Sequence, residues 1–294
     1  MKVKKKVKKA VIPAAGLGTR VLPASKSVPK EMLPIVDKPA IQYIVEEAVA
    51  SGIEDILIIT NRGKSIMEDH FDRSPELEQR LYQSGKQQLY EEMVAISHLA
   101  NIQYVRQKET KGLGHAVACA KSFVGDEPFA VLYGDDVIIG EIPATRQLCD
   151  AYEKYQKGVV GIQYVPTEQI GKYCTLAVEP IEPKIFAVSD MIEKPKPEQI
   201  ISNYAILGRC VLPPDIFSLL ENLPAGAGGE IQLTDAMRLV AQREGMIGVV
   251  YDSKRYDMGN KLGILQATIE VGVRHPEIGK EFQEYLKEFV KTLG

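Results

Sequence analysis

Short apolar runs alternate with amphipathic stretches through the first half of the chain, and this alternation restricts the fold more than any other feature. It is the pattern of strands joined by crossover helices, and it predicts an α/β fold with a mixed, mostly parallel central sheet flanked by helices. Residues 39–51 read as one helix, because Pro39 suits a first turn and Gly52 suits a stop. The predicted strands are residues 9–13, 55–60, 102–106, 129–133 and 159–164, and further helices are predicted at 75–99, with a break near 84–85, and at 113–123.

The chain changes character after about residue 165, where Pro-rich turns separate strand-like pieces. These pieces predict a second half-sheet with antiparallel strands that leans on the first. The last segment reads as an amphipathic helix that either caps the core or pairs with a second subunit, and we expect a homo-oligomer. The predicted strands are 173–178, 187–192, 204–212 and 247–251, and the predicted helices are 232–244, 259–274 and 277–293.

A glycine-containing loop, Ala14-Ala15-Gly16-Leu17-Gly18-Thr19-Arg20, follows the first predicted strand. Small residues leave backbone N–H groups accessible, so an anion can approach them closely. Arg20 adds a planar donor suited to phosphate oxygens, and Lys30 adds a point charge that can stabilise a phosphorus centre under attack. The loop is also compatible with a plain strand-to-helix turn. It fits neither a P-loop nor a dinucleotide fingerprint, since Val21 stands where a third glycine belongs.

Two carboxylates, Asp135 and Asp136, follow the apolar run 129–133. In an open α/β sheet, ligands bind at the carboxyl ends of the strands, and carboxylates there can hold Mg²⁺ against phosphate oxygens. The segment 134–136 is also compatible with an ordinary turn at a strand exit. The loop and the two carboxylates together predict a site for a phosphorylated ligand.

Charge and composition exclude several classes of protein. A net charge of -3 and a pI of about 5.9 argue against a dedicated nucleic-acid binder, and the lysines of the first nine residues read as a solvated tail. No apolar stretch approaches the length of a membrane span or of a signal-peptide core. The four cysteines form no CxxC pair, which disfavours zinc and disulfide scaffolds and fits a reducing compartment. We therefore expect a cytoplasmic protein with small-molecule partners and neither nucleic-acid nor membrane partners.

The most specific signal is a series of short segments spread over nearly the whole chain. They are residues 14–20, 22–24, 29–34, 37–39, 107, 112–116, 134–136, 193–195, 204–209, 229–235 and 256–259. In this order they resemble the signature of bacterial sugar-1-phosphate nucleotidylyltransferases, and within that family the members that use UTP and glucose 1-phosphate. Each segment alone is modest, but their number and order make coincidence improbable.

The resemblance implies a Rossmann-like nucleotide-diphospho-sugar transferase fold and an enzyme that makes UDP-glucose and pyrophosphate from UTP and glucose 1-phosphate, with Mg²⁺ as cofactor. It implies a single domain over residues 1–294, with a nucleotide-binding half at about 8–165 and a sugar-binding half at about 166–294. The implied residues are Arg20, Lys30, Asp135 and Lys194 for catalysis, Ala14, Ala15, Gly16, Gly18, Gln107 and Gly112 for the nucleotide, Asp136, Gly171 and Glu193 for the sugar, and Asp135 and Asp257 for the metal.

The implied chemistry needs no general base, because the second ionisation of a phosphate monoester lies at about pH 6 and the attacking oxygen is already charged. The same reaction on dTTP is one alternative, and a non-catalytic nucleotide-sugar-binding homologue is another. Simpler interpretations also remain for two of the picks. Gln107 equally suits a hydrogen bond to its own turn, and Glu193-Lys194 equally suits a solvated loop.

Overall fold

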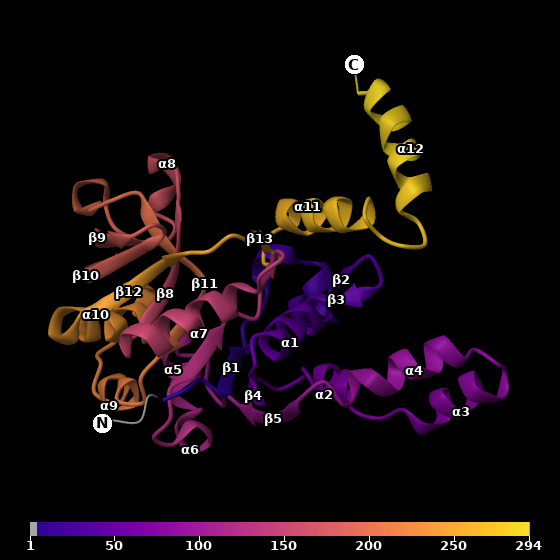
Figure 1. The fold of residues 1–294 in the computed structure, drawn as a ribbon, viewed down its shortest axis with the longest axis horizontal. Helices are drawn as coiled ribbons and strands as arrows, with labels where there is room; N and C mark the ends of the chain where they lie inside the picture. Colours follow the sequence, from indigo (N-terminus) through magenta and orange to yellow (C-terminus); the bar gives the residue numbers. More distant parts are fainter. Residues whose placement is uncertain (1–4, 294) are drawn as a thin grey trace.

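A nine-stranded sheet forms the centre of the structure, a computed structural model that describes residues 5–293 (Figure 1). Helices lie on both sides of this sheet, which confirms the predicted α/β fold with a mixed central sheet. Four of its eight neighbouring strand pairs are parallel and four are antiparallel, so parallel pairs are fewer than predicted. In spatial order the strands are β5 (Asn101–Arg106), β4 (Asp55–Thr60), β1 (Lys9–Pro13), β6 (Phe129–Leu132), β11 (Tyr204–Leu212), β8 (Val159–Tyr164), β12 (Met246–Val250), β10 (Ile185–Glu193) and β9 (Cys174–Glu182). The accompanying helices are α1 (Ala40–Ala50), α2 (Ile66–Phe71), α5 (Leu113–Ala118), α6 (Lys121–Val124), α7 (Ala144–Tyr155), α8 (Thr167–Ile170), α9 (Ile216–Leu220), α10 (Leu233–Glu244) and α11 (Lys261–Gly272).

Parallel pairing is concentrated on the side of the sheet that comes from the first half of the chain. There β1 lies parallel to both β4 and β6, and β4 lies parallel to β5. The antiparallel strands predicted after residue 165 are present, since β11 runs antiparallel to β6 and β8, and β10 runs antiparallel to β9 and β12. They do not form a separate half-sheet, however. β11 inserts between β6 and β8, and this joins both halves of the chain into one sheet.

Strand β1 shows how the sheet separates two apolar cores. Ala10 and Ile12 belong to the core that includes α1 and α7, whereas Val11 belongs to the core that includes α5 and α10. This division follows from the alternation of side chains along a strand. Because both faces of β1 are buried, the strand reads as an unbroken apolar run, and its carboxyl end is where polar ligands can be reached.

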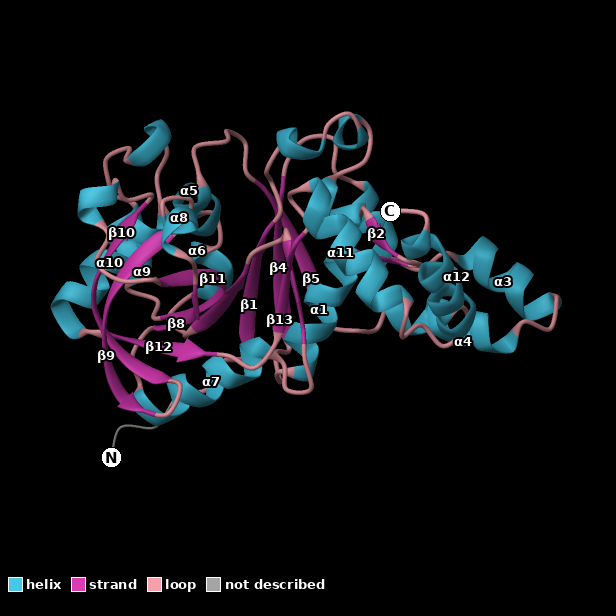
Figure 2. Cartoon of the chain, turned by 90° about the horizontal axis from the view of Figure 1, so that it is seen from above, coloured by secondary structure: helices cyan, strands magenta, loops and turns pink. Residues whose placement is uncertain are grey.

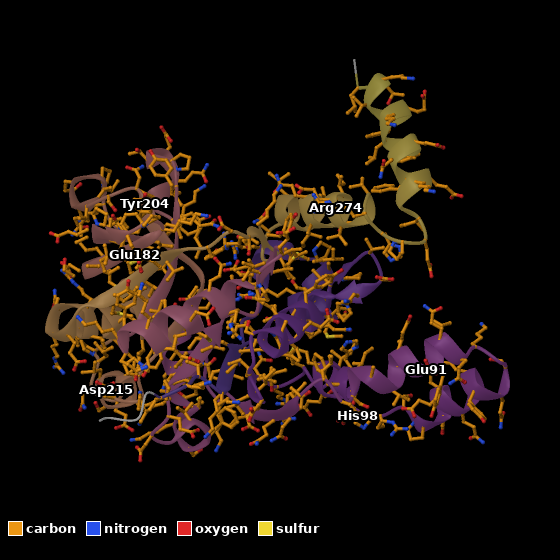
Figure 3. The ribbon with its side chains drawn as sticks, viewed as in Figure 1. Glu91, His98, Glu182, Tyr204, Asp215 and Arg274 are labelled. Atoms are coloured by element: carbon orange, nitrogen blue, oxygen red, sulfur yellow. The ribbon has the colours of Figure 1, made fainter. Side chains whose placement is uncertain are left out.

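Two helical segments extend away from the sheet (Figures 1 and 2). The predicted helix 75–99 is a hairpin of α3 (Pro75–Gln83) and α4 (Gln87–Ile96), and its predicted break is confirmed by Gly85, whose φ is 72°. Glu91 and His98 mark this hairpin in Figure 3, far from Tyr204 and Glu182 of the sheet. The closing helix α12 (Gly279–Lys291) is also confirmed, but it does not cap the core, since Gly279 is its one buried residue.

Two small antiparallel ribbons were not predicted. β2 (Pro34–Ile35) pairs with β3 (Lys38–Pro39), and β7 (Asp136–Ile139) pairs with β13 (Lys254–Asp257). The predicted helix 113–123 is divided into α5 and α6. No helix in the described part of the chain is both long and apolar enough to cross a membrane.

Candidate active site

The loop after β1 combines buried alanines with exposed glycine. Ala14 and Ala15 are buried, and the Ala14 N–H donates to the Ile59 carbonyl at 2.8 Å, which fixes the loop against β4. Gly18 has φ of 68°, a backbone conformation that a side chain would strain. At Gly16 the fold would tolerate a side chain, since an added Cβ comes no closer than 3.7 Å to the Lys30 Nζ. Glycine is therefore not required at position 16 by the packing of the loop, but its small size leaves the adjacent space free.

A cavity of about 390 Å³ lies beside this loop, and we call it the loop cavity. Its lining brings together six residues that the sequence predicts for the site, from β1, β5, β6 and the segments after them. Ala14 and Gly18 support the loop from outside this lining. The six are Ala15, Gly16, Lys30, Gln107, Gly112 and Asp135.

Gln107 and Gly112 form one wall of the loop cavity. The Gln107 Nε2 donates to the Gly112 carbonyl at 3.2 Å and lies 2.9 Å from the His115 Nδ1, so the simpler interpretation of Gln107 as a turn-stabilising residue is partly correct. Gly112 has φ of 98°, and an added Cβ would lie 2.7 Å from the Glu230 Cβ and 2.8 Å from the Ile231 carbonyl. Glycine is thus required at this position for both conformation and space.

A second cavity, of about 230 Å³, adjoins the first, and we call it the β11 cavity. Both cavities share Leu113, Tyr133 and Asp135 in their linings. The β11 cavity contains the predicted residues Arg20, Asp135, Asp136, Glu193 and Asp257. Asp135 therefore lies where two compartments meet, which is the arrangement needed to bring two ligands together. A third cavity, of about 670 Å³, lies between α1 and the α3–α4 hairpin and contains none of the predicted residues.

Two cations and two carboxylates converge at this junction. The Lys30 Nζ lies 2.5 Å from the Asp135 Oδ2, while the Arg20 guanidinium reaches both Asp135, at 3.5 Å, and Asp257, at 3.3 Å. Burial alone raises the pKa of Asp135, but Lys30 and then Arg20 lower it by more, so this pKa lies below its usual range. Burial lowers the pKa of Lys30, yet Asp135 and Glu31 together raise it by more, so the net pKa is above its ordinary value.

Gly259 lets these charges lie close together, because the position has no side chain to separate them. An added Cβ there would lie 2.9 Å from both the Asp135 Oδ2 and the Asp257 Oδ1 and would collide with the Arg20 guanidinium. The Gly259 N–H itself donates to the Asp257 Oδ1 at 2.8 Å. The two carboxylates are brought together by the unpredicted ribbon, in which Asp257 pairs directly with Asp136.

Asp136 is almost fully buried, with 3% of its surface exposed. Its carboxylate forms an ion pair with Arg255 at 2.6 Å, and its carbonyl accepts from the buried Arg209 at 2.9 Å. Burial raises the pKa of Asp136 to about 6, although Arg255 opposes the shift. Arg255 was not predicted, yet it lines the β11 cavity, and its Cζ lies 5.8 Å from the centre of the Tyr173 ring. Its position just before the matching segment 256–259 is the signal that points to it.

The remaining predicted sugar-side residues divide into two groups. Glu193 lines the β11 cavity, accepts a hydrogen bond from Thr234 at 3.0 Å and has a pKa raised by burial. Lys194 and Gly171 are exposed and lie outside the lining of both cavities. Lys172, next to Gly171 in the chain, lines the β11 cavity instead. Lys194 has φ of 45°, which is unusual for a residue with a side chain, and its N–H donates to the Tyr173 carbonyl at 2.8 Å. Such strained positions often accompany functional sites.

No group of three or more His, Cys, Asp or Glu side chains in the described chain is placed to hold a metal ion by itself. The two carboxylates at the junction nevertheless suit a shared site. Mg²⁺ is commonly bound by one or two carboxylates together with substrate phosphates and water. The Arg20 guanidinium contacts both carboxylates, Asp135 through Nη2 and Asp257 through Nη1.

Similar proteins of known family and structure identify the family to which this chain belongs. Residues 9–272 match the nucleotidyl transferase family. The UTP–glucose-1-phosphate uridylyltransferase YngB of Bacillus subtilis (strain 168) is 55% identical over 289 residues, which cover 98% of this chain and 97% of the relative. A UTP-bound UGPase from Acinetobacter baumannii is 41% identical with a TM-score of 0.88, over 96% of this chain and 99% of that one. A UDP-glucose pyrophosphorylase complexed with UDP-glucose is 41% identical with a TM-score of 0.83, over 92% of this chain and 100% of that one. This chain therefore belongs to the nucleotidyl transferase family, among the UTP–glucose-1-phosphate uridylyltransferases.

Proposed function

We propose that this protein transfers a uridylyl group from UTP to glucose 1-phosphate and releases pyrophosphate. The observation that carries the proposal is the position of Asp135, which lines both adjoining cavities and is contacted by Lys30 and Arg20. The similarity to a UTP-bound UGPase and to a UDP-glucose complex supports the choice of substrates. A phosphate oxygen of glucose 1-phosphate forms the new bond to the α-phosphorus of UTP as the bond to pyrophosphate breaks.

The residues of the site supply position and charge. The loop cavity holds the nucleotide, with its base beside Gln107 and Gly112, while the β11 cavity holds the sugar beside Asp136 and Glu193. Lys30 and Arg20 neutralise the negative charge that accumulates when two anions are brought together. The attacking phosphate needs no proton removed, so none of the histidines is assigned a catalytic role.

Mg²⁺ is a further part of the proposal, with Asp135 and Asp257 as its protein ligands. The close approach of the two carboxylates to Gly259, which has no side chain, supports the assignment. When bound, the ion polarises phosphate oxygens and offsets their charge. Asp135 and Asp257 would hold the ion, and Lys30 and Arg20, which lie beside them, would contact the phosphates.

One assay tests the proposed reaction. Pyrophosphate release is measured over a matrix of nucleoside triphosphates, including dTTP, and sugar 1-phosphates, each with and without Mg²⁺. Release that is strongest with UTP and glucose 1-phosphate, and that depends on Mg²⁺, is the expected result. A preference for dTTP would support the thymidylyl alternative. No pyrophosphate release with any pair of substrates would support a non-catalytic homologue.

Lys194→Ala is expected to raise KM for glucose 1-phosphate by about ten-fold or more with little change in KM for UTP, since a charged hydrogen bond to the sugar phosphate is lost. Lys172→Ala is the competing variant, because Lys172 lies nearby and lines the β11 cavity. Steady-state kinetics with each substrate varied separately make the comparison. A larger effect of Lys172→Ala would mean that Lys172, and not Lys194, contacts the sugar phosphate.

We also propose that the protein acts in the cytoplasm as a homo-oligomer. Helix α12 extends away from the rest of the structure (Figure 1), and Tyr285 and Val290 on it are exposed to 60% and 63%. Apolar surface of this kind commonly marks a protein–protein contact. The molar mass measured by light scattering, before and after removal of α12, tests this part of the proposal.

A further inference from the structure

Glu31 and Lys64 form a buried ion pair beneath the loop cavity. Glu31 is 0% exposed and Lys64 is 6% exposed. The Lys64 Nζ donates to the Glu31 Oε2 at 2.8 Å and also to the Ala14 carbonyl. This pair ties together the loop after β1, the loop after β4 and the short 3-10 turn Lys30–Met32. Neither residue has a role in the reaction described above.

One carboxylate oxygen of this ion pair makes no hydrogen bond within the described chain. The Glu31 Oε1 is buried and has no hydrogen-bond partner among residues 5–293, although Glu31 lines the loop cavity. Burial raises the pKa of Glu31, and Lys64 and Lys30 oppose that shift. A buried oxygen without a partner is costly, so its retention on the wall of a binding cavity indicates a partner on the ligand.

The chemistry of a carboxylate narrows the choice of partner. An ionised carboxylate only accepts hydrogen bonds, so its partner must be a donor. UTP has three donors apart from any protonated phosphate, namely the N3–H of uracil and the two ribose hydroxyls. Gln107 uses its Nε2 on the Gly112 carbonyl and His115, which makes its amide oxygen the acceptor for the base N3–H. The ribose hydroxyls remain for Glu31.

The order of residues along the cavity agrees with this assignment. Ribose connects the base to the α-phosphate, so it must lie between the wall formed by Gln107 and Gly112 and the charges of Lys30 and Asp135. Glu31 directly follows Lys30 in the chain, and Lys64 holds it against Ala14 at the end of β1. We propose that Glu31 accepts a hydrogen bond from a ribose hydroxyl of the nucleotide and that Lys64 is the positioning residue that holds it there. This inference rests on UTP being the substrate.

The test compares nucleotides that differ only in the ribose. The ratio of kcat/KM for UTP to that for 2′-deoxy-UTP, and separately for 3′-deoxy-UTP, is measured at saturating glucose 1-phosphate. A site built to bind a hydroxyl rejects an analogue without it strongly, so at least one ratio should be about 100 or more in the wild type. Two ratios near one, in an enzyme that uses UTP well, would overturn the inference without affecting the proposed function. Failure of the wild type to use UTP at all would instead overturn the proposed function.

Glu31→Met combined with Lys64→Met removes the acceptor without leaving a buried charge unpaired, which favours retention of the fold. The large ratio should fall below about 5, because only the hydroxyl-bearing nucleotide loses a contact. General damage to the site would lower activity with both nucleotides and preserve the ratio, and a preserved ratio would contradict the inference. Lys38→Met with Glu46→Met is the matched control, since this pair lies outside both cavities, and its ratio should stay at the wild-type value.

Glu31→Gln provides a second measurement in case the double variant does not fold. Lys64 should draw the amide oxygen, so that the NH₂ group faces the ribose and forms a neutral hydrogen bond in place of a charge-assisted one. The ratio should then lie between the wild-type value and that expected for the double variant. A Glu31→Gln ratio equal to that of the wild type would contradict a role for the carboxylate.

Discussion

Asp135→Asn is expected to lower kcat by about 10²–10³-fold at saturating Mg²⁺, since one preorganised electrostatic contact at a reacting centre is commonly worth that much. Asparagine has nearly the same shape as aspartate, so Lys30 and Arg20 keep a polar neighbour and the fold should persist. What is lost is the negative charge that lies 2.5 Å from the Lys30 Nζ and lines both cavities. Pyrophosphate release against Mg²⁺ concentration measures the effect, and circular dichroism during heating checks the fold.

Asp252→Asn is the matched control for this change. Asp252 pairs with Lys184 on the surface, where its side chain is 61% exposed, so activity and melting temperature should both match the wild type. A folded Asp135→Asn protein that retains a tenth or more of wild-type turnover would remove Asp135 as a metal ligand. A variant that fails to fold would show instead that the charge cluster at the junction is mainly structural.

The elements that were predicted accurately are those whose own residues are sufficient to determine their secondary structure. Strands β1, β4 and β8 occupy the predicted bounds, because each contains a buried apolar run that is recognisable in the sequence. The hairpin α3–α4 was also predicted with its break, because Gly85 adopts a conformation that disfavours helix. Local chemistry is sufficient at such positions.

Features that depend on distant partners were not predicted. β13 is the polar segment Lys254–Asp257, and it becomes a strand only because β7, far away in the sequence, lies beside it. The insertion of β11 between β6 and β8 likewise depends on pairing that no local pattern encodes. Lys64 belongs to a stretch of polar residues that is typical of a solvated turn, so its buried contact with Glu31 could not be predicted from the sequence.

The structure brings many of the predicted site residues together, but their roles stay predictions. Resemblance placed Asp135 and Asp257 in one site although the chain separates them widely, and the structure brings both to Arg20. Their roles, like those of Lys194 and Gly171, stay predictions until kinetics separate them. Arg255 and Thr234 were not predicted because charged and hydroxyl side chains usually face solvent, whereas here they contact Asp136 and Glu193.

A buried ion pair between α1 and β11 supports the sugar side of the site. The Glu47 carboxylate accepts from the Arg209 Nε at 3.1 Å and from the Thr145 hydroxyl at 2.7 Å. Arg209 is 1% exposed, and it also donates to the Asp136 carbonyl at 2.9 Å. Glu47 therefore balances the charge of the residue that holds Asp136 in place.

Glu47→Met is expected to lower the free energy of unfolding by about 3–5 kcal/mol, because it leaves the Arg209 charge buried without a partner. Glu46→Met, one residue earlier on the same helix, should cost no more than about 1 kcal/mol, since its pair with Lys38 is partly exposed. Combining Glu47→Met with Arg209→Met should restore part of the loss, because two apolar side chains replace a desolvated pair. Urea unfolding of the variants measures these differences. Equal losses in Glu46→Met and Glu47→Met would show that burial of the Arg209 charge is not what makes Glu47 necessary.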